Sequence, residues 1–245
     1  MAGFGDGASR HPQVRAWVAE RAASLRLPVS VGLLCETAVV RLGVSGAAVT
    51  VDNAAGWAET RHTTDTLSTR LAELQVTVGE GPCTDAHRAG SLVLVADLDS
   101  PASQRRWPLF APLAVDAGAC ALFALPLCVG TIQVGILALH QLKPGQLTAP
   151  TLTDALAFAA LARRLLLDEQ AGLPNTDGDP ADALALHSPQ VHQATGMIAA
   201  QLDEPMQDAF SRLRARAFTS QQPLAELAAD VVARRVRFDH PDEAT

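Results

Sequence analysis

The stretch ALFALPLCVGTIQVGILALH, residues 121–140, decides the class of fold. It lies in the longest apolar run of the chain, residues 119–140, but Pro126, Gly130 and Gly135 interrupt that run. A membrane helix needs about 20 consecutive apolar residues, so the interruptions argue against a membrane span. The pattern predicts two β-strands, over residues 119–127 and 132–140, joined by a turn.

Alternation in the second of these strands predicts its place in the sheet. One face carries Ile132, Val134, Ile136 and Ala138, and the other carries Leu137 and Leu139. A strand that is apolar on both faces is usually covered on both sides. We therefore expect this strand to be central.

The same patterns extend over the rest of the first 170 residues. Strands are predicted over 47–51, 57–62 and 92–96, and helices over 30–42 and 147–170. Pro12 begins a leading helix whose spaced residues are Val14, Trp17, Val18, Arg21 and Leu25. This first domain is predicted to be α+β, a sheet with helices at both ends of its sequence.

Composition and length indicate two domains. The chain has 245 residues, of which 48% are hydrophobic and 18% charged, so there is enough apolar material for buried cores. The stretch AGLPNTDGDPAD, from residue 171, has linker composition. We predict an N-terminal extension with the leading helix over 1–29, a sheet domain over 30–170, a linker over 171–186, a helical domain over 187–238 and an acidic tail over 239–245.

Three short amphipathic helices are predicted in the helical domain. Ser188 caps the first helix, and Pro205 and Pro223 open the second and third. Their apolar stripes are Val191, Ala194, Ile198 and Leu202; then Met206, Phe210, Leu213 and Ala217; then Leu224, Leu227, Val231 and Phe238. Such helices with brief connections form an all-α bundle.

The first helix has a bare face opposite its apolar stripe, formed by Gln193, Gly196 and Ala200. A glycine within a helix costs about 1 kcal/mol relative to alanine. One interpretation is that a partner backbone approaches closely here. The other is an ordinary alanine-rich solvent face.

The arginines of the bundle suit nucleic acid but do not establish it. The whole chain has a net charge of −7, to which residues 187–238 contribute +1 and the rest −8. Arg212 and Arg216 point away from the apolar stripe and are candidates for phosphate contacts. Arg214, at the stripe edge, either packs and pairs with an acid or reaches a base. Arg234, Arg235 and Arg237 fall in the predicted last turns of the third helix, where the helix dipole favours cations.

Three strings of the bundle, VHQATGMIAAQL (191–202), DAFSRLRARA (208–217) and PLAELAADVVARRVRF (223–238), resemble the ANTAR domain of bacterial antitermination regulators. Thr195 and Ala199 to Ala200 stand where many members carry bulkier or basic residues. The resemblance implies binding to RNA made of paired stem-loops, which would prevent formation of a transcription terminator. The RNA-binding residues expected on this basis are Gln193, Ala194, Gly196, Arg212, Arg214, Arg216, Arg234 and Arg235.

The strings VTVGEGPCTDA (76–86), DLDSPASQRRWPLF (97–110) and residues 121–140 resemble a GAF domain of the kind that precedes ANTAR in actinobacterial regulators. The resemblance runs from about residue 30 to 167. It implies a sensor module that binds a small molecule, a nucleotide, a haem or nothing, and whose flanking helices form a homodimer. The candidate ligand region is Gly79, Gly81, Pro82, Cys83 and Trp107, and no cofactor is predicted.

The cysteines and histidines leave alternatives open. Cys83 follows a Gly/Pro turn, where a short helix would favour the thiolate, or it is a buried small residue closing a loop. With His87 it makes at most half a metal site, so no metal is predicted, and the lack of a CxxC pair or secretory signal indicates reduced, cytoplasmic thiols. Haem ligands are sought among His62, His87 and His140, although isolated histidines are more often ordinary surface or core groups.

The sequence thus predicts a cytoplasmic, non-enzymatic RNA-binding antitermination regulator with a GAF-like sensor domain. It contains no nucleophile elbow, complete metal-ligand set or acid/base pair that would indicate catalysis. The alternatives are a regulator that docks a partner protein through the Gly196 and Ala200 face, and a thiol redox sensor that uses Cys83.

Overall fold

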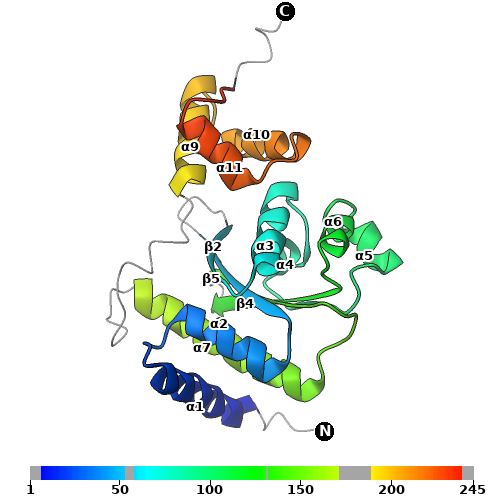
Figure 1. The fold of residues 1–245 in the computed structure, drawn as a ribbon, viewed down its shortest axis with the longest axis vertical. Helices are drawn as coiled ribbons and strands as arrows, with labels where there is room; N and C mark the ends of the chain where they lie inside the picture. The colour runs from blue at the N-terminus through cyan, green and yellow to red at the C-terminus, as the bar shows by residue number, and fades with distance from the viewer. Residues whose placement is uncertain (1–6, 53–57, 131, 171–188, 239–245) are drawn as a thin grey trace, which may run out of the picture.

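A computed structural model describes residues 7–52, 58–130, 132–170 and 189–238 of the chain (Figure 1). The predicted linker over 171–186, the Ser188 cap, Trp57 and the tail over 239–245 lie outside the described residues. The described part has a five-stranded antiparallel sheet with helices on both faces, followed by three further helices. None of the described helices has the length and hydropathy needed to cross a membrane.

The sheet has the strand order β2-β1-β5-β4-β3. Its strands are β1 (Gly46–Asp52), β2 (Ala58–Thr63), β3 (Val93–Val95), β4 (Ala121–Val129) and β5 (Ile132–Gln141). All five predicted strands are confirmed to within three residues at each described end. The central position predicted for β5 is also confirmed, because β5 pairs with both β1 and β4.

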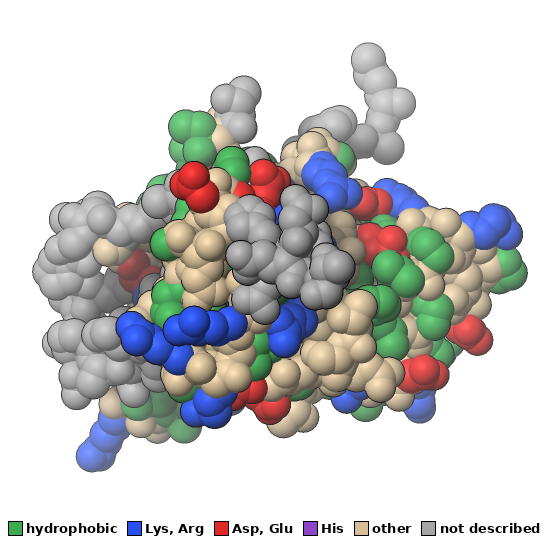
Figure 2. Space-filling view, turned by 90° about the horizontal axis from the view of Figure 1, so that it is seen from above, with side chains coloured by type: hydrophobic (Ala, Val, Ile, Leu, Met, Phe, Trp, Pro, Cys, Tyr) green, Lys and Arg blue, Asp and Glu red, His purple; other side chains and the backbone are tan. Residues whose placement is uncertain are grey.

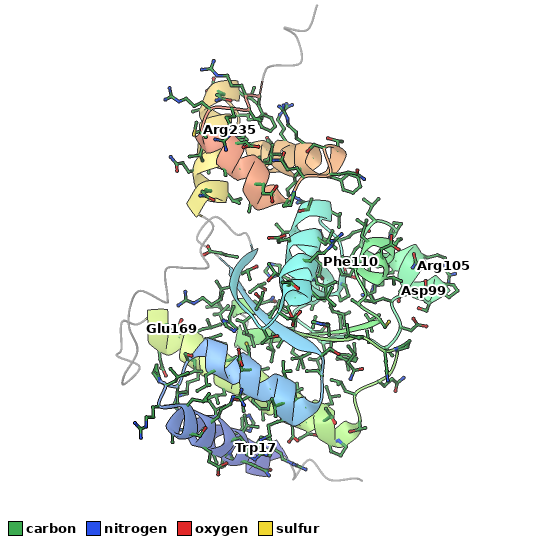
Figure 3. All side chains as sticks on the ribbon, viewed as in Figure 1. Trp17, Asp99, Arg105, Phe110, Glu169 and Arg235 are labelled. Atoms are coloured by element: carbon green, nitrogen blue, oxygen red, sulfur yellow. The ribbon has the colours of Figure 1, made fainter. Side chains whose placement is uncertain are left out.

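One face of the sheet is covered by α2 (Val31–Leu42) and α7 (Ala149–Gln170), and α1 (Gly7–Leu25) packs on the outer side of these two helices (Figure 1). Leu137 and Leu139 of β5 are buried in this layer with Phe158 of α7. Trp17 of α1 stacks on Phe158 with 6.3 Å between the ring centroids. At the end of α7, Glu169 accepts a 2.7 Å hydrogen bond from Arg61 of β2, which ties the helix to the sheet edge (Figure 3).

The other face is covered by α3 (Thr66–Val78), α4 (Pro82–Ala89), α5 (Pro101–Arg106) and α6 (Phe110–Asp116) (Figure 1). Ile136 of β5 is buried there with Leu71 of α3 and Phe110 of α6. Helices at the two ends of the domain's sequence were predicted, whereas α3, α5 and α6 were not. The domain is α+β as expected, with one more helical layer than predicted.

The alternation predicted along β5 holds only for its second half. Leu127 of β4 pairs with Gly135, but Cys128 pairs with Gln133, so Val134 is an extra residue in the register. Such a bulge reverses the alternation. Val134 accordingly packs into the layer of Leu137 and Leu139 instead of joining Ile136, and Ile132 is exposed.

The C-terminal helices are α9 (Pro189–Leu202), α10 (Met206–Thr219) and α11 (Leu224–Val232). They follow the sheet domain and pack on one another around a shared apolar cluster, here called the bundle. Its buried residues are Ala194, Ile198, Leu202, Ala209, Phe210, Leu213, Ala217, Leu224, Leu227, Ala228 and Val231. Two predicted stripe residues differ: Met206 is 42% exposed, and Phe238 lies beyond the end of α11 and is only partly buried.

The bundle lies against α3 of the sheet domain (Figure 1). Val76 of α3 packs on the bundle core. Arg214 of α10 donates a 3.0 Å hydrogen bond from Nε to the Thr77 carbonyl oxygen. The two domains are therefore in contact through α3 and α10, and this contact forms part of the cavity described next.

Candidate functional site

A cavity of about 230 Å³ lies between the sheet, α3 and α4, and α10 of the bundle closes part of it. This volume is below the roughly 300–1,000 Å³ of pockets for drug-sized molecules, so a small organic molecule fits it better than a tetrapyrrole. The wall is largely apolar, with polar groups at separate points. The polar and charged side chains that line it are Thr50, Ser68, Gln75, Cys83, Thr84, His87, Arg88, His140 and Arg214.

Local sequence fixes the helices that border the cavity. Asp65 caps α3 by accepting a 2.8 Å hydrogen bond from the Ser68 backbone N–H, and Gly79 ends the helix with a φ of 75°. Pro82 then begins α4, and Gly90 ends it with a φ of 60°. These are the ordinary signals for a helix start and a left-handed helix end.

Ser68, His140 and Asp65 form a buried polar group at one end of the cavity. Ser68 Oγ donates to Asp65 Oδ2 at 2.7 Å and lies 3.3 Å from His140 Nδ1. Burial lowers the pKa of His140 more than Asp65 raises it, so its imidazole is neutral at pH 7.

The hydrogen bonds of this group do not form a Ser-His-Asp relay. The Ser68 proton is directed to Asp65, which leaves the Ser68 oxygen to accept from His140. A catalytic serine instead gives its proton to the histidine. The group therefore organises the start of α3 and one wall of the cavity.

Gln75 and the turn after α3 form another part of the cavity wall. Gln75 Oε1 accepts a 2.7 Å hydrogen bond from the Cys83 backbone N–H. Gly81 has a φ of 136°, and a Cβ there would collide with the Gln75 side chain. Glycine is needed at this position for both reasons.

The predicted ligand region is brought to the cavity only in part. Gly79 and Cys83 line it, while Gly81 and Pro82 lie beside it. Trp107 is buried elsewhere, in the layer beneath α6, and its Nε1 donates to Asp85 Oδ2 at 3.1 Å. The assignment of Trp107 to a ligand site is therefore wrong: its apolar ring fills the domain core.

Cys83 does not have the environment of a reactive thiol. Burial raises the pKa of Cys83 to about 12, against a smaller lowering effect of its hydrogen bond with Gln75. At pH 7 roughly one thiol in 10⁵ is then ionised. Cys83 is half-buried and lines the cavity, so its weak ionisation, and not a lack of access, argues against the thiol redox interpretation.

We expect Cys83 to resist oxidation and alkylation in the folded chain. After mild peroxide or iodoacetamide at pH 7, intact-peptide mass spectrometry should show Cys83 modified at least about tenfold more slowly than an unfolded control. Alkylation should accelerate only as pH rises toward 12. Rapid, selective modification of Cys83 at neutral pH would restore the redox interpretation.

The three candidate haem ligands are separated by the fold. His87 and His140 line the cavity, whereas His62 does not. His140 is committed to Ser68 and Asp65, and His87 Nδ1 lies 2.8 Å from Gln133 Nε2. No cluster of three or more His, Cys, Asp or Glu suited to a metal occurs among the described residues.

Two arginines from different domains line the cavity beside the end of α3, and because Arg88 is exposed to solvent we refer to this side of the cavity as its opening. Arg88 of α4 donates from Nη2 to the Gly79 carbonyl oxygen at 3.2 Å, near the Thr77 carbonyl that holds Arg214. A Cβ at Gly79 would collide with the Arg214 guanidinium. Burial lowers the pKa of Arg214, and the positive charge of Arg88 lowers it further.

Of the two roles predicted for Arg214, the structure shows the one in which its side chain packs at the edge of the stripe. Among the described residues it has no acidic partner. Its guanidinium also lies over the Phe210 ring, 5.7 Å from the centroid. In this arrangement it faces the sheet domain and is not displayed for RNA. Sequence reasoning placed it at the stripe edge but had no signal for the residues that it meets, because Thr77 is 137 residues away.

The other residues predicted to bind RNA differ in their exposure to solvent. Ala194 is fully buried in the bundle core, so its assignment to an RNA surface is wrong. Gln193 is exposed, and a Cβ added at Gly196 would meet nothing within 4 Å. The bare face of α9 is therefore open, and no other part of the described chain approaches Gly196 closely.

The exposed arginines of the bundle fall into two groups. Arg212 pairs with Glu204 at 2.8 Å, and Arg235, labelled in Figure 3, pairs with Asp230 at 2.7 Å. Among the described residues no salt bridge is formed by Arg216, Arg234 or Arg237. Figure 2, which looks onto the bundle end of the molecule, shows basic side chains dispersed among acidic and hydrophobic ones.

The position of the last arginines differs from the prediction. α11 ends at Val232, and Arg234 has a φ of 59°, so Arg234, Arg235 and Arg237 lie in a turn after the helix. This turn folds back on α10: Arg216 Nη1 donates to the Arg237 carbonyl oxygen at 2.8 Å and lies over the Phe238 ring. Arg216 therefore joins the end of the described chain to the bundle.

Comparison with solved structures finds GAF domains. A GAF domain of a phosphoenolpyruvate-protein phosphotransferase from Acinetobacter is 12% identical, with a TM-score of 0.49, over 67% of this chain and 95% of that one. The corresponding domain from Coxiella burnetii is 14% identical, with a TM-score of 0.49, over 66% and 97%. The second GAF domain of DevS from Mycobacterium smegmatis is 19% identical, with a TM-score of 0.41, over 58% and 95%.

Comparison of the sequence with family models and with curated proteins identifies no family for this chain. No family model matches the chain, and no curated protein matches it. The resemblance of residues 187–238 to ANTAR domains consequently rests on the three motif strings and on the bundle that they form.

Proposed function

We propose that this chain is an RNA-binding regulator of transcription antitermination, in which a GAF-like sensor domain controls a C-terminal ANTAR-like bundle. The observation that carries the proposal is where the residues of the motif strings lie in the bundle. Phe210, Leu213 and Ala217 of the second motif string form the bundle core. Gly196 and Arg216 stand outside that core, at the surface of the bundle.

The surface of the bundle suits a folded RNA. RNA-binding proteins read shape, phosphates and unstacked bases, and arginine serves both phosphate and base contacts. Arg216, Arg234 and Arg237 supply positive charge without a salt bridge among the described residues. The open face at Gly196 allows a backbone to approach.

The sensor function rests on the cavity between the sheet, α3 and α4, which is lined by the domain and by α10 of the bundle. We propose that it takes a small molecule and that the protein acts by binding, without catalysis. We also propose a cytoplasmic homodimer through the helical layer of α1, α2 and α7. Two bundles in one dimer would strengthen RNA binding through effective concentration.

The test is binding of the full chain to a labelled tandem-hairpin RNA, compared with duplex DNA of equal phosphate number. We expect RNA to bind at least about tenfold more tightly, and binding to weaken as salt rises. Arg216→Gln should reduce RNA affinity about tenfold and lower the salt slope by about one. Arg105→Gln, on α5 away from the bundle (Figure 3), is the matched control and should change neither.

Equal affinity for RNA and DNA would overturn the proposal. So would an Arg216→Gln effect no larger than that of Arg105→Gln. Either result would favour the alternative in which the open face around Gly196 docks a protein.

A further inference from the structure

The opening of the cavity holds two cations that no described acid neutralises. Arg88 and Arg214 both line the cavity, and each uses one guanidinium N–H in a hydrogen bond to a backbone carbonyl at the end of α3. The nearby acids are engaged elsewhere: Asp85 pairs with Arg106 at 2.8 Å, and Glu80 accepts from the Leu109 and Phe110 backbone N–H groups.

Two like charges at one opening oppose the contact between the domains. The carbonyl groups at the C-terminus of α3 offset only part of that charge, because a helix end carries about half an elementary charge. An anion that accepted hydrogen bonds from both guanidinium groups would convert the repulsion into attraction. Arginine is well suited to this, because its planar fork matches a carboxylate.

The contact between the domains also has an apolar part and further charged side chains. Its apolar part includes Val76 of α3 and Phe210 of α10. Burial, and to a smaller extent the negative charge of Glu226 of α11, raises the pKa of Glu73 of α3, against a lowering effect of Arg70. The like charges of Arg88 and Arg214 meet across this contact, so its strength depends on what occupies the cavity.

The wall of the cavity behind the arginines indicates which chemical group the rest of the ligand carries. Its wall between the two arginines and the sheet includes Leu71, Ala72, Leu122 and Ile136. A compact apolar group would fill it and remove that surface from water. The anionic group would remain at the opening, where the charges are.

We propose that Arg88 and Arg214 form a site for a small organic carboxylate whose apolar body fills the cavity, and that this ligand holds the bundle against the sheet domain. Arg214 is then kept from RNA. The ligand consequently acts as a repressor of RNA binding. This last step rests on the RNA-binding function proposed above, whereas the carboxylate site itself does not.

The first experiment measures carboxylate binding without RNA. Benzoate is titrated into the full chain by calorimetry, with neutral benzamide and inorganic phosphate as comparison probes. We expect benzoate to bind at least tenfold more tightly than either. Arg88→Gln and Arg214→Gln should each weaken benzoate binding at least tenfold, while Arg105→Gln leaves it unchanged.

The second experiment repeats the RNA titration with saturating benzoate. We expect benzoate to weaken RNA binding by the wild-type chain at least tenfold. In Arg88→Gln, RNA binding without benzoate should equal or exceed that of the wild type, and benzoate should have little effect on it. Arg88 lies outside the bundle, so its substitution removes no RNA contact.

The outcomes separate the two proposals. Benzoate binding that requires both arginines, in a chain that does not bind RNA, supports the site and overturns the RNA function. RNA binding by a chain to which benzoate does not bind at millimolar concentration overturns the site. Benzoate binding that is unaffected by Arg88→Gln and Arg214→Gln also overturns it.

Discussion

Replacement of Leu213 by alanine is expected to abolish RNA binding while the sheet domain stays folded. Leu213 is fully buried at the centre of the bundle. Removing a buried leucine side chain costs about 2–5 kcal/mol. A bundle of this length has a total stability of only about 2.5–7.5 kcal/mol, so most of that stability would be lost.

The measurement pairs circular dichroism with RNA titration. Leu213→Ala should show loss of helical signal and at least about a hundredfold loss of RNA affinity. Phe218→Ala is the matched control, because Phe218 lies on the same helix and is 42% exposed. A Leu213→Ala chain that unfolds its bundle yet binds RNA as the wild type does would place RNA binding outside residues 189–238.

Replacement of Gly135 by alanine is expected to destabilise the sheet domain more than any surface change. Gly135 is buried in β5 opposite Val51 of β1, and a Cβ there would overlap the backbone carbonyl oxygen of Thr50. Backbone in the middle of a sheet cannot move without disturbing its hydrogen bonds, so the cost is about 3 kcal/mol. The expected fall in Tm is roughly 10 °C.

Gly145→Ala provides the control for this change. A Cβ at Gly145 would lie 3.9 Å from Gln141 Oε1, an ordinary van der Waals contact, so this replacement should shift the Tm by little. Thermal unfolding followed by circular dichroism compares the two variants. Equal Tm values for Gly135→Ala and the wild type would contradict the close approach of β5 and β1.

Elements that depend on local sequence could be predicted. Pro126, Gly130 and the apolar residues around them delimit β4 and β5 without reference to the rest of the chain, and the strand boundaries follow from them. The bulge at Val134 could not be predicted in this way, because it depends on how β4 and β5 are paired. The α3 helix had a usable signal in the Asp65 cap and in the spacing of Leu67, Leu71 and Leu74.

The candidate site depends on contacts between distant segments and was predicted only in part. Gly79 and Cys83 were singled out because they lie beside a Gly/Pro turn, and both line the cavity. Ser68 and His140 were not brought together by sequence reasoning, because 72 residues separate them. Arg214 was predicted as an RNA contact from its motif position, but its orientation toward the sheet domain depends on the packing of α10 on α3.

The most direct test of the proposed function is to crosslink the full-length protein to RNA in its native cells and to sequence the bound fragments. The account predicts that the fragments concentrate in RNA able to form two adjacent hairpins next to a transcription terminator, and that Leu213→Ala loses this enrichment. Fragments distributed in proportion to transcript abundance, with the same distribution in Leu213→Ala, would contradict it.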